Sequence, residues 1–242
     1  LREADQLALL DRLAQYYAEM PFRAERQPGL RYWLDNPHYA YADGIFLYGM
    51  LRELRPARLI EIGCGHSSTL ILDVNERVFA TRPRCTFIDP HPELLLSLTT
   101  AADRERSTLI ARGLQQVDRA VFDELQAGDV LFIDSTHISK IDSDVHHLVF
   151  DIVPRLAPGV LVHVHDIFYP FEYPPAWIDE GRGWNEAYLW RAFLQHNRAF
   201  SIVCMNSYLQ QFHADRLRAI MPLAMQTPGC ALWLRRNEEN RA

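Results

Sequence analysis

The fold of this chain is decided by the stretch Leu59-Ile60-Glu61-Ile62-Gly63-Cys64-Gly65-His66-Ser67-Ser68. Its short apolar run predicts a buried strand, its two glycines predict a tight turn, and Ser67 or Ser68 is a candidate N-cap for a helix that begins at Thr69. Such a unit places a ligand at the exposed N-terminus of the helix, where free N–H groups and the helix dipole favour an anionic group. We therefore expect a cofactor at this turn; the alternative is a turn that only joins strand to helix.

Two classes of cofactor use a turn of this kind. A dinucleotide requires the pattern G-x-G-x-x-G, but Ser68 occupies the third glycine position and the carboxylate of Glu61 disfavours a phosphate. S-adenosylmethionine (SAM) fits better, because it carries an ammonium and a sulfonium besides its carboxylate. The pattern Glu61-x-Gly63-x-Gly65-x-Ser67 resembles the first motif of class I SAM-dependent methyltransferases. This resemblance implies that the cofactor-binding residues include Glu61, Gly63, Gly65, Ser67 and Ser68.

Composition limits the class of protein. The 242 residues, 48% of them hydrophobic, suit a single α/β domain with a helical cap over residues 1–55 and a core over residues 56–242. The net charge of −6, without a run of basic residues, argues against a nucleic-acid partner. The four cysteines form no CxxC pair, and no apolar run is long enough to span a bilayer. We therefore expect a cytoplasmic protein with no membrane partner.

Strands and helices alternate through the rest of the sequence. Beyond the strand before Gly63, hydrophobic patterning predicts strands at 85–89, 108–111, 129–134, 160–166, 200–205 and 230–235. Helices are predicted at 4–20, 45–54, 69–79, 140–156, 184–196 and 214–221. This alternation is typical of a Rossmann-like, doubly wound, mostly parallel sheet.

Polar residues at strand ends are the further candidates for ligand binding. Asp89 lies where doubly wound folds place the acid that binds ribose hydroxyls, although it also suits a helix cap. Gln115 follows the third strand, where an adenine would lie. Asp134 and Asp166 end two neighbouring strands and should face the same crevice. The aromatic segment 168–184 is too long for a simple connection and is interpreted as a substrate lid, with a plain surface loop as the alternative.

Five strings extend the resemblance over nearly the whole chain: IEIGCGHSS, FIDPHPE, LFIDSTH, PRLAPGVLVHVHDIFYPFEYP and WNEAYLW. They resemble the class I group that contains bacterial small-molecule and sugar O-methyltransferases of the macrocin and mycinamicin type. The resemblance implies a seven-stranded sheet whose last strand is antiparallel. It also implies a small-molecule or sugar acceptor, and it leaves a homo-oligomer open.

The same resemblance implies roles for residues at the crevice. Asp134 and His137 form a D-x-x-H pattern, in which Asp134 binds a divalent cation and His137 is the general base; a helix-capping role is the alternative for His137. Methyl transfer to an alcohol needs such a base because the hydroxyl loses its proton. Relatives carry two adjacent acids where this chain has His165 and Asp166, so the expected metal ligands are Asp134, His165 and Asp166, holding magnesium or manganese; zinc, or a site without a metal, is the alternative.

Three other functions remain compatible with the sequence. A nicotinamide-dependent oxidoreductase would share the sheet and Asp89, although Glu61 and Ser68 argue against it. A metal-dependent hydrolase built on His137, His163, His165 and Asp166 would leave the glycine turn unexplained. A non-catalytic SAM-binding protein would keep the fold without the transfer reaction.

Overall fold

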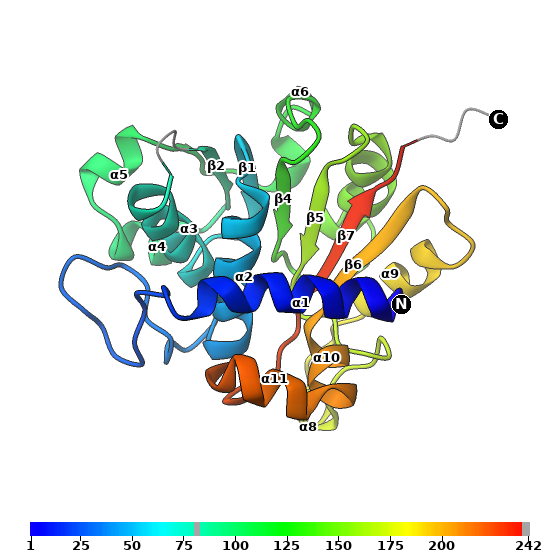
Figure 1. Ribbon diagram of the computed structural model, residues 1–242. Helices are drawn as coiled ribbons and strands as arrows, with labels where there is room; N and C mark the ends of the chain where they lie inside the picture. The colour runs from blue at the N-terminus through cyan, green and yellow to red at the C-terminus, as the bar shows by residue number, and fades with distance from the viewer. Residues whose placement is uncertain (80–82, 239–242) are drawn as a thin grey trace.

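The computed structural model describes residues 1–79 and 83–238, and a seven-stranded sheet lies at its centre (Figure 1). Its strand order is β3-β2-β1-β4-β5-β7-β6, and only β7 runs antiparallel to its neighbours. The doubly wound fold with an antiparallel last strand is therefore confirmed. The strands are β1 (Arg58–Ile62), β2 (Arg84–Ile88), β3 (Thr108–Ile110), β4 (Val130–Ile133), β5 (Leu161–Val164), β6 (Phe200–Met205) and β7 (Leu232–Arg236).

The central strands form the core because both faces of the sheet are covered. Every residue of β4 and of β5 is buried, as expected for parallel strands that carry helices on each side. Strand β4 accordingly is an unbroken apolar run, whereas β5 contains the buried His163 between two valines. The helices are α1 (Glu3–Tyr17), α2 (Tyr41–Leu54), α3 (His66–Arg77), α4 (Glu93–Leu98), α5 (Ala101–Glu105), α6 (Ala120–Asp123), α7 (Asp144–His146), α8 (Pro175–Asp179), α9 (Glu186–Leu194), α10 (Asn206–Phe212) and α11 (Ala214–Ile220).

Three predicted helix starts are wrong. Helix α2 begins at Tyr41 rather than at residue 45. Helix α3 begins at His66 rather than Thr69, so its N-cap is Gly65, and Ser68 lies in the first turn, where its hydroxyl accepts a hydrogen bond from the Gly65 N–H. The helix predicted from residue 140 begins only at Asp144, where the Ser143 side chain caps it, and it continues through a π-helical turn, η2 (His147–Ile152), and a 3₁₀ turn, η3 (Val153–Arg155). The residues before Asp144 form a loop, and that loop lines the site described below.

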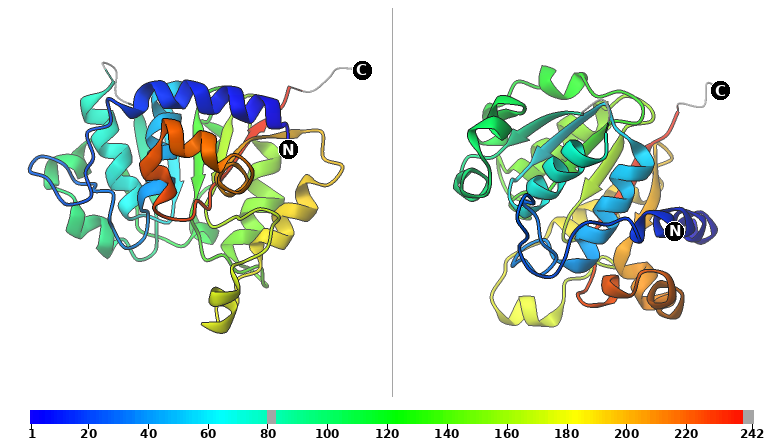
Figure 2. Two further views of the ribbon diagram at one scale, coloured as in Figure 1. Left: turned by 60° about the horizontal axis from the view of Figure 1, so that its bottom comes forward. Right: turned by 60° about the vertical axis from the view of Figure 1, so that its left-hand side comes forward.

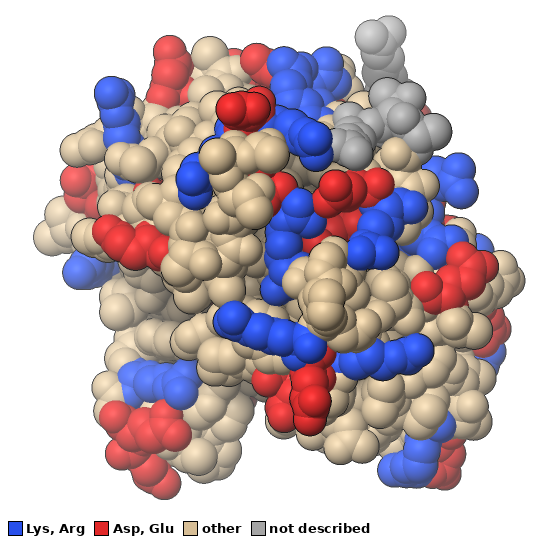
Figure 3. All heavy atoms as spheres, turned by 90° about the vertical axis from the view of Figure 1, so that its left-hand side faces the viewer, with Lys and Arg blue, Asp and Glu red and all other residues tan. Residues whose placement is uncertain are grey.

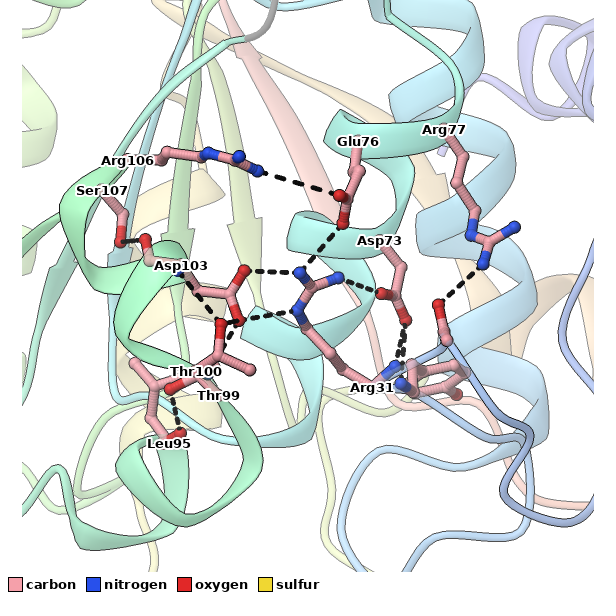
Figure 4. A network of polar contacts seen from close by, with 12 residues as sticks. Arg31, Asp73, Glu76, Arg77, Leu95, Thr99, Thr100, Asp103, Arg106 and Ser107 are labelled. Atoms are coloured by element: carbon pink, nitrogen blue, oxygen red, sulfur yellow. Dashed lines mark hydrogen bonds and ion pairs between the residues drawn. The ribbon is translucent and has the colours of Figure 1, made fainter.

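The N-terminal segment is fastened to α3 by an ion-pair network around Arg31 (Figure 4). The Arg31 guanidinium contacts Asp73 of α3 at 2.6 Å and Asp103 of α5 at 2.5 Å, and both carboxylates are almost fully buried. Burial alone favours the neutral Asp103, but hydrogen bonds from Arg31 and Thr100 outweigh it and lower the Asp103 pKa to about 2. The network therefore fixes the segment before α2 against the helix that follows the glycine turn.

Replacing Arg31 should destabilise the fold. We expect Arg31→Ala to lower the free energy of unfolding by about 3 kcal/mol, because it leaves two buried carboxylates without their cation. Urea denaturation of the purified protein measures this difference. Arg77→Ala is the matched control. The exposed Arg77 guanidinium donates to the Gly29 carbonyl at 2.7 Å, so this variant should lose less than about 1 kcal/mol of the free energy of unfolding. Equal losses in the two variants would contradict the role of the network.

Two features of the surface bear on function. Figure 2 shows that the segment containing α8 projects from the body of the molecule in both views. On the face drawn in Figure 3, basic and acidic side chains are interspersed, so this face offers no extended basic surface to a nucleic acid. Within residues 1–79 and 83–238, no helix has both the length and the hydrophobicity needed to cross a membrane.

Candidate active site

The register of the parallel strands sets out the candidate residues in a row. Ile62 pairs with Ile88 on one side and with Ile133 on the other, and Ile133 pairs with Val164. The next residue of each strand is therefore Asp89, Gly63, Asp134 or His165, in that order across β2, β1, β4 and β5. Backbone hydrogen bonds continue past the strand ends, because the N–H groups of Gly63, Asp134 and His165 donate to Ile88, Ile62 and Ile133. This edge is where open α/β sheets bind ligands.

Gly63 makes the close packing at this edge possible. Its φ of +80° lies in the left-handed region, and a Cβ built on it would lie 1.7 Å from the carbonyl oxygen of Asp134. Glu61, two residues earlier, is fully buried and accepts a hydrogen bond from the Ser67 hydroxyl at 2.5 Å. Ser68 in turn accepts a hydrogen bond from the Gly65 N–H at 3.0 Å. These bonds hold the turn in one shape.

A cavity of about 550 Å³ opens beside the turn. Its volume lies within the range of sites for cofactors and other small molecules. Its walls include four of the predicted site residues, Gly63, Asp89, Gln115 and Asp134. Asp89 accepts hydrogen bonds from the N–H groups of Cys64 and His91, so it braces the turn and still faces the cavity.

Other predicted cofactor residues lie behind the turn. Glu61, Gly65, Ser67 and Ser68 are not among the residues that line the cavity. One oxygen of Glu61, Oε2, is buried and has no hydrogen-bond partner among the described residues. Burial raises the pKa of Glu61 to about 8, although the hydroxyls of Ser67 and Ser68 oppose the shift. The Gln115 side chain donates to the Asp142 carbonyl at 2.8 Å and so joins two loops of the cavity wall.

His137 brings the acids of the two strands together. Its Nε2 lies 3.3 Å from Asp134 Oδ1 and 3.5 Å from Asp166 Oδ2. On the other side of the ring, Nδ1 lies 2.5 Å from Oε1 of Glu186 in α9. Single donor atoms of Asp134, His137 and Asp166 all lie within 4.8 Å of one another, a set that is able to hold a metal ion.

The opposite charges in this group shift one another's pKa values. Burial disfavours the charged imidazole, but hydrogen bonds and charges from Asp134 and Glu186 outweigh it and hold the His137 pKa well above its ordinary value. Burial tends to raise the pKa of Asp134, but the charges of His165 and His137 lower it below its ordinary value. The group is therefore a set of opposite charges in which His137 is buried and the two carboxylates are partly exposed.

His165 belongs to a second group of possible ligands. It lies with Asp43 and Cys230, whose donor atoms also fall within 4.8 Å of one another, and all three residues are buried. Its Nε2 is 3.6 Å from Cys230 Sγ and 3.7 Å from Asp166 Oδ1. The structure thus places His165 next to the Asp134, His137 and Asp166 group rather than inside it. The neighbouring His163 ring has no hydrogen-bond partner for either nitrogen among the described residues.

Aromatic side chains from the segment 168–184 cover the His137 side of the site. The Trp184 ring lies 4.2 Å from the His137 ring, and Trp177 packs against both Trp184 and Phe168. The Arg182 guanidinium lies over Trp177 at 4.3 Å and over Trp184 at 5.0 Å. The segment therefore contacts the catalytic candidates, a placement compatible with the predicted lid.

Comparison with known families finds a similarity over part of the chain. Residues 60–167, which run from β1 to the residue after Asp166, match the family described as a methyltransferase domain. The matched span contains the glycine turn, Asp89, Asp134 and His137, so most of the candidate site lies within it.

Individual proteins are also similar to this chain. An uncharacterized protein of Archaeoglobus fulgidus is 26% identical over 128 residues, which cover 52% of this chain and 58% of that protein's length. The O-methyltransferase TomG of Streptomyces achromogenes, solved with SAM, is 14% identical, with coverages of 95% and 90% and a TM-score of 0.51. The Podospora anserina methyltransferase PaMTH1, solved with bound SAH, is 14% identical, with coverages of 95% and 88% and a TM-score of 0.54. At these identities the two solved structures show that the methyltransferase fold is shared.

One residue of the site was missed by the sequence analysis. Glu186 lies 49 residues after His137 and outside the span that matches the methyltransferase domain family. Its signal was the string WNEAYLW, in which an acid stands among aromatic residues at the start of a predicted helix. Without the fold, nothing connected that acid to His137.

Proposed function

We propose that this protein transfers the methyl group of SAM to a hydroxyl group of a small molecule. One observation carries the proposal: the cavity beside the glycine turn reaches Asp134, and Asp134 belongs to the buried group with His137 and Asp166. A cofactor in the cavity would thus lie next to an acid and a base. The solved relatives support the same reaction, since TomG is an O-methyltransferase.

The residues of the turn fit SAM. Gly63 lets the Asp134 carbonyl pack directly against the turn, and Asp89 offers a carboxylate to ribose hydroxyls at the end of β2. Oε2 of the buried Glu61 has no partner among the described residues, and a cationic ligand near the turn would favour the charged form of this carboxyl group, whose pKa burial raises.

The chemistry assigned to His137 follows from methyl transfer. A hydroxyl attacks the sulfonium methyl more readily as it loses its proton, and the neutral form of His137 would accept that proton at Nε2. Asp134 and Asp166 would then stabilise the imidazolium that forms. The same two carboxylates would hold a divalent cation, which would offset their charge, favour the neutral imidazole before the reaction and supply positive charge to a forming alkoxide.

The acceptor is proposed to be a sugar or another small hydroxylated compound. Aromatic rings such as Trp177 and Trp184 present flat apolar faces beside the polar group around His137. Such a combination suits a ligand with both an apolar face and hydroxyl groups. The acids near His137 disfavour an anionic acceptor.

Calorimetric titration with SAM tests the proposal first. We expect saturable binding of SAM and of S-adenosylhomocysteine, and no binding of NAD. Transfer of label from methyl-labelled SAM to a panel of sugars, phenols and other alcohols then tests the reaction. Absence of SAM binding would refute the proposal, whereas SAM binding without transfer to any panel member would favour a non-catalytic SAM-binding protein.

A divalent cation should bind at the carboxylates. We expect Mn²⁺ to bind the chelator-treated protein in a calorimetric titration and Asp166→Asn to abolish that binding, because one of two anionic ligands is lost. Asp151→Asn is the matched control, since Asp151 pairs with Arg119 on the surface. Parallel titration of His165→Ala tests whether His165 adds a ligand. Unchanged Mn²⁺ affinity in Asp166→Asn would leave these carboxylates without a metal.

A further inference from the structure

We infer that Glu186 is the positioning residue for His137: it fixes the imidazole so that Nδ1 is the donor and Nε2 faces the acids of the site. This inference rests on the proposed function, in which His137 Nε2 accepts the proton. Glu186 reaches His137 from α9, which begins 49 residues later in the chain. It would act through His137 and would not touch the substrate.

Both carboxylate oxygens of Glu186 are engaged by neighbouring side chains, and His137 is the closer partner. Its Oε1 lies 2.5 Å from His137 Nδ1, and its Oε2 accepts a weaker bond from Trp190 Nε1 at 3.3 Å. Only 1% of Glu186 is exposed, so water does not compensate its charge. A buried carboxylate is costly unless it is paired, and the close partner here is the imidazole.

The backbone of the same segment holds the backbone of His137. The N–H groups of Asn185 and Glu186 both donate to the His137 carbonyl, at 3.0 and 3.3 Å. The Asn185 side chain accepts from the Ser139 N–H at 2.6 Å and donates to the Ser139 carbonyl at 3.3 Å. His137 has a φ of +59°, an unusual value for a non-glycine residue, which neighbouring contacts must maintain.

Trp184 completes the contact from a third direction, since its ring lies 4.2 Å from the imidazole. Three consecutive residues, Trp184, Asn185 and Glu186, therefore hold the ring face, the backbone and Nδ1 of one histidine. Of the three, only Glu186 selects which nitrogen faces the site. A histidine that donates Nδ1–H to a carboxylate has Nε2 left for a proton or a metal ion.

Nuclear magnetic resonance of the full-length, histidine-¹⁵N-labelled protein tests the inference without an acceptor. A ring N–H shared with a buried carboxylate should give a slowly exchanging resonance, which His137→Gln identifies by its loss. We expect Glu186→Ala to abolish this resonance. Glu186→Gln should retain it at a shifted position, because the amide carbonyl still accepts the bond without the charge.

A matched variant separates positioning from simple stability. Trp190→Phe removes the hydrogen bond to Glu186 Oε2 and disturbs the same helix, but it leaves Oε1 on His137. We expect Trp190→Phe to lower stability and to retain the His137 resonance. An unchanged resonance in Glu186→Ala, or its equal loss in Trp190→Phe and Glu186→Ala, would overturn the inference.

Turnover gives a second readout. With an acceptor found in the panel above, we expect Glu186→Ala to lower kcat about 10- to 100-fold, the usual effect of losing a partner that orients a histidine. The dissociation constant for SAM should not change, and Glu186→Gln should recover part of kcat. If the wild type transfers no methyl group, the proposed function fails, while the resonance still decides whether Glu186 orients His137.

Discussion

Gly63→Ala is expected to lower the affinity for SAM about 100-fold or more, equivalent to roughly 3 kcal/mol of binding free energy. The new Cβ would lie 1.7 Å from the Asp134 carbonyl oxygen, so either β1 or the end of β4 must move. Because the interior of the sheet is closely packed, that shift would distort the cavity wall. Calorimetric titration with SAM measures the loss.

Gly128→Ala provides the control for backbone strain. Gly128 has a φ of +87°, close to that of Gly63, but a Cβ there meets no atom within 4 Å. It precedes β4 and so lies at the opposite edge of the sheet from the cavity. Its variant should lose about 1 kcal/mol of stability and keep its SAM affinity. Wild-type SAM affinity in a folded Gly63→Ala protein would contradict the assigned cofactor site.

His137→Gln is expected to reduce methyl transfer by about 10²- to 10⁴-fold, the contribution typical of a general base. Binding of SAM should be retained, because His137 is not among the residues that line the cavity. Glutamine keeps a polar side chain of similar length but does not accept a proton at neutral pH. Single-turnover transfer at saturating SAM measures the change in the chemical step.

His213→Gln is the control for loss of a histidine elsewhere. His213 pairs with Glu3 at 3.0 Å, between α10 and α1, and contributes nothing to the site. Its variant should transfer methyl groups at the wild-type rate. Normal transfer by His137→Gln would show that another group accepts the proton, and the assignment of His137 would then be wrong.

The sequence predicted the elements whose residues carry a local signal. The apolar run before Gly63 is strand β1, and the strand predicted at 200–205 has the observed bounds. The predicted start of α3 was wrong because the N-cap is Gly65: the Ser67 hydroxyl bonds to Glu61, and Ser68 accepts from the Gly65 N–H from its place in the first turn. The short π-helical turn at η2 has no hydrophobic period of its own, so patterning assigned it to an ordinary helix.

The residues of the candidate site also differ in how far a local sequence pattern predicts them. Gly63, Asp89 and Asp134 were predicted because each ends or follows a strand, and the parallel register then places them side by side. The position of His165 relative to Asp166 depends on which way each side chain points beyond β5, a matter of tertiary packing against Asp43 and Cys230. The contact between Glu186 and His137 joins residues far apart in sequence, and no local pattern predicts it.

The position of α9 has a consequence for how proteins of this kind diverge. The glycine turn and the acids of the sheet lie within residues 60–167, whereas the aromatic segment and Glu186 lie after that span. Residues 168–190 therefore carry both the surface proposed for the acceptor and the carboxylate of Glu186, which contacts His137. An exchange of that one stretch between relatives would change acceptor choice and proton handling together and would leave the cofactor half of the sequence untouched.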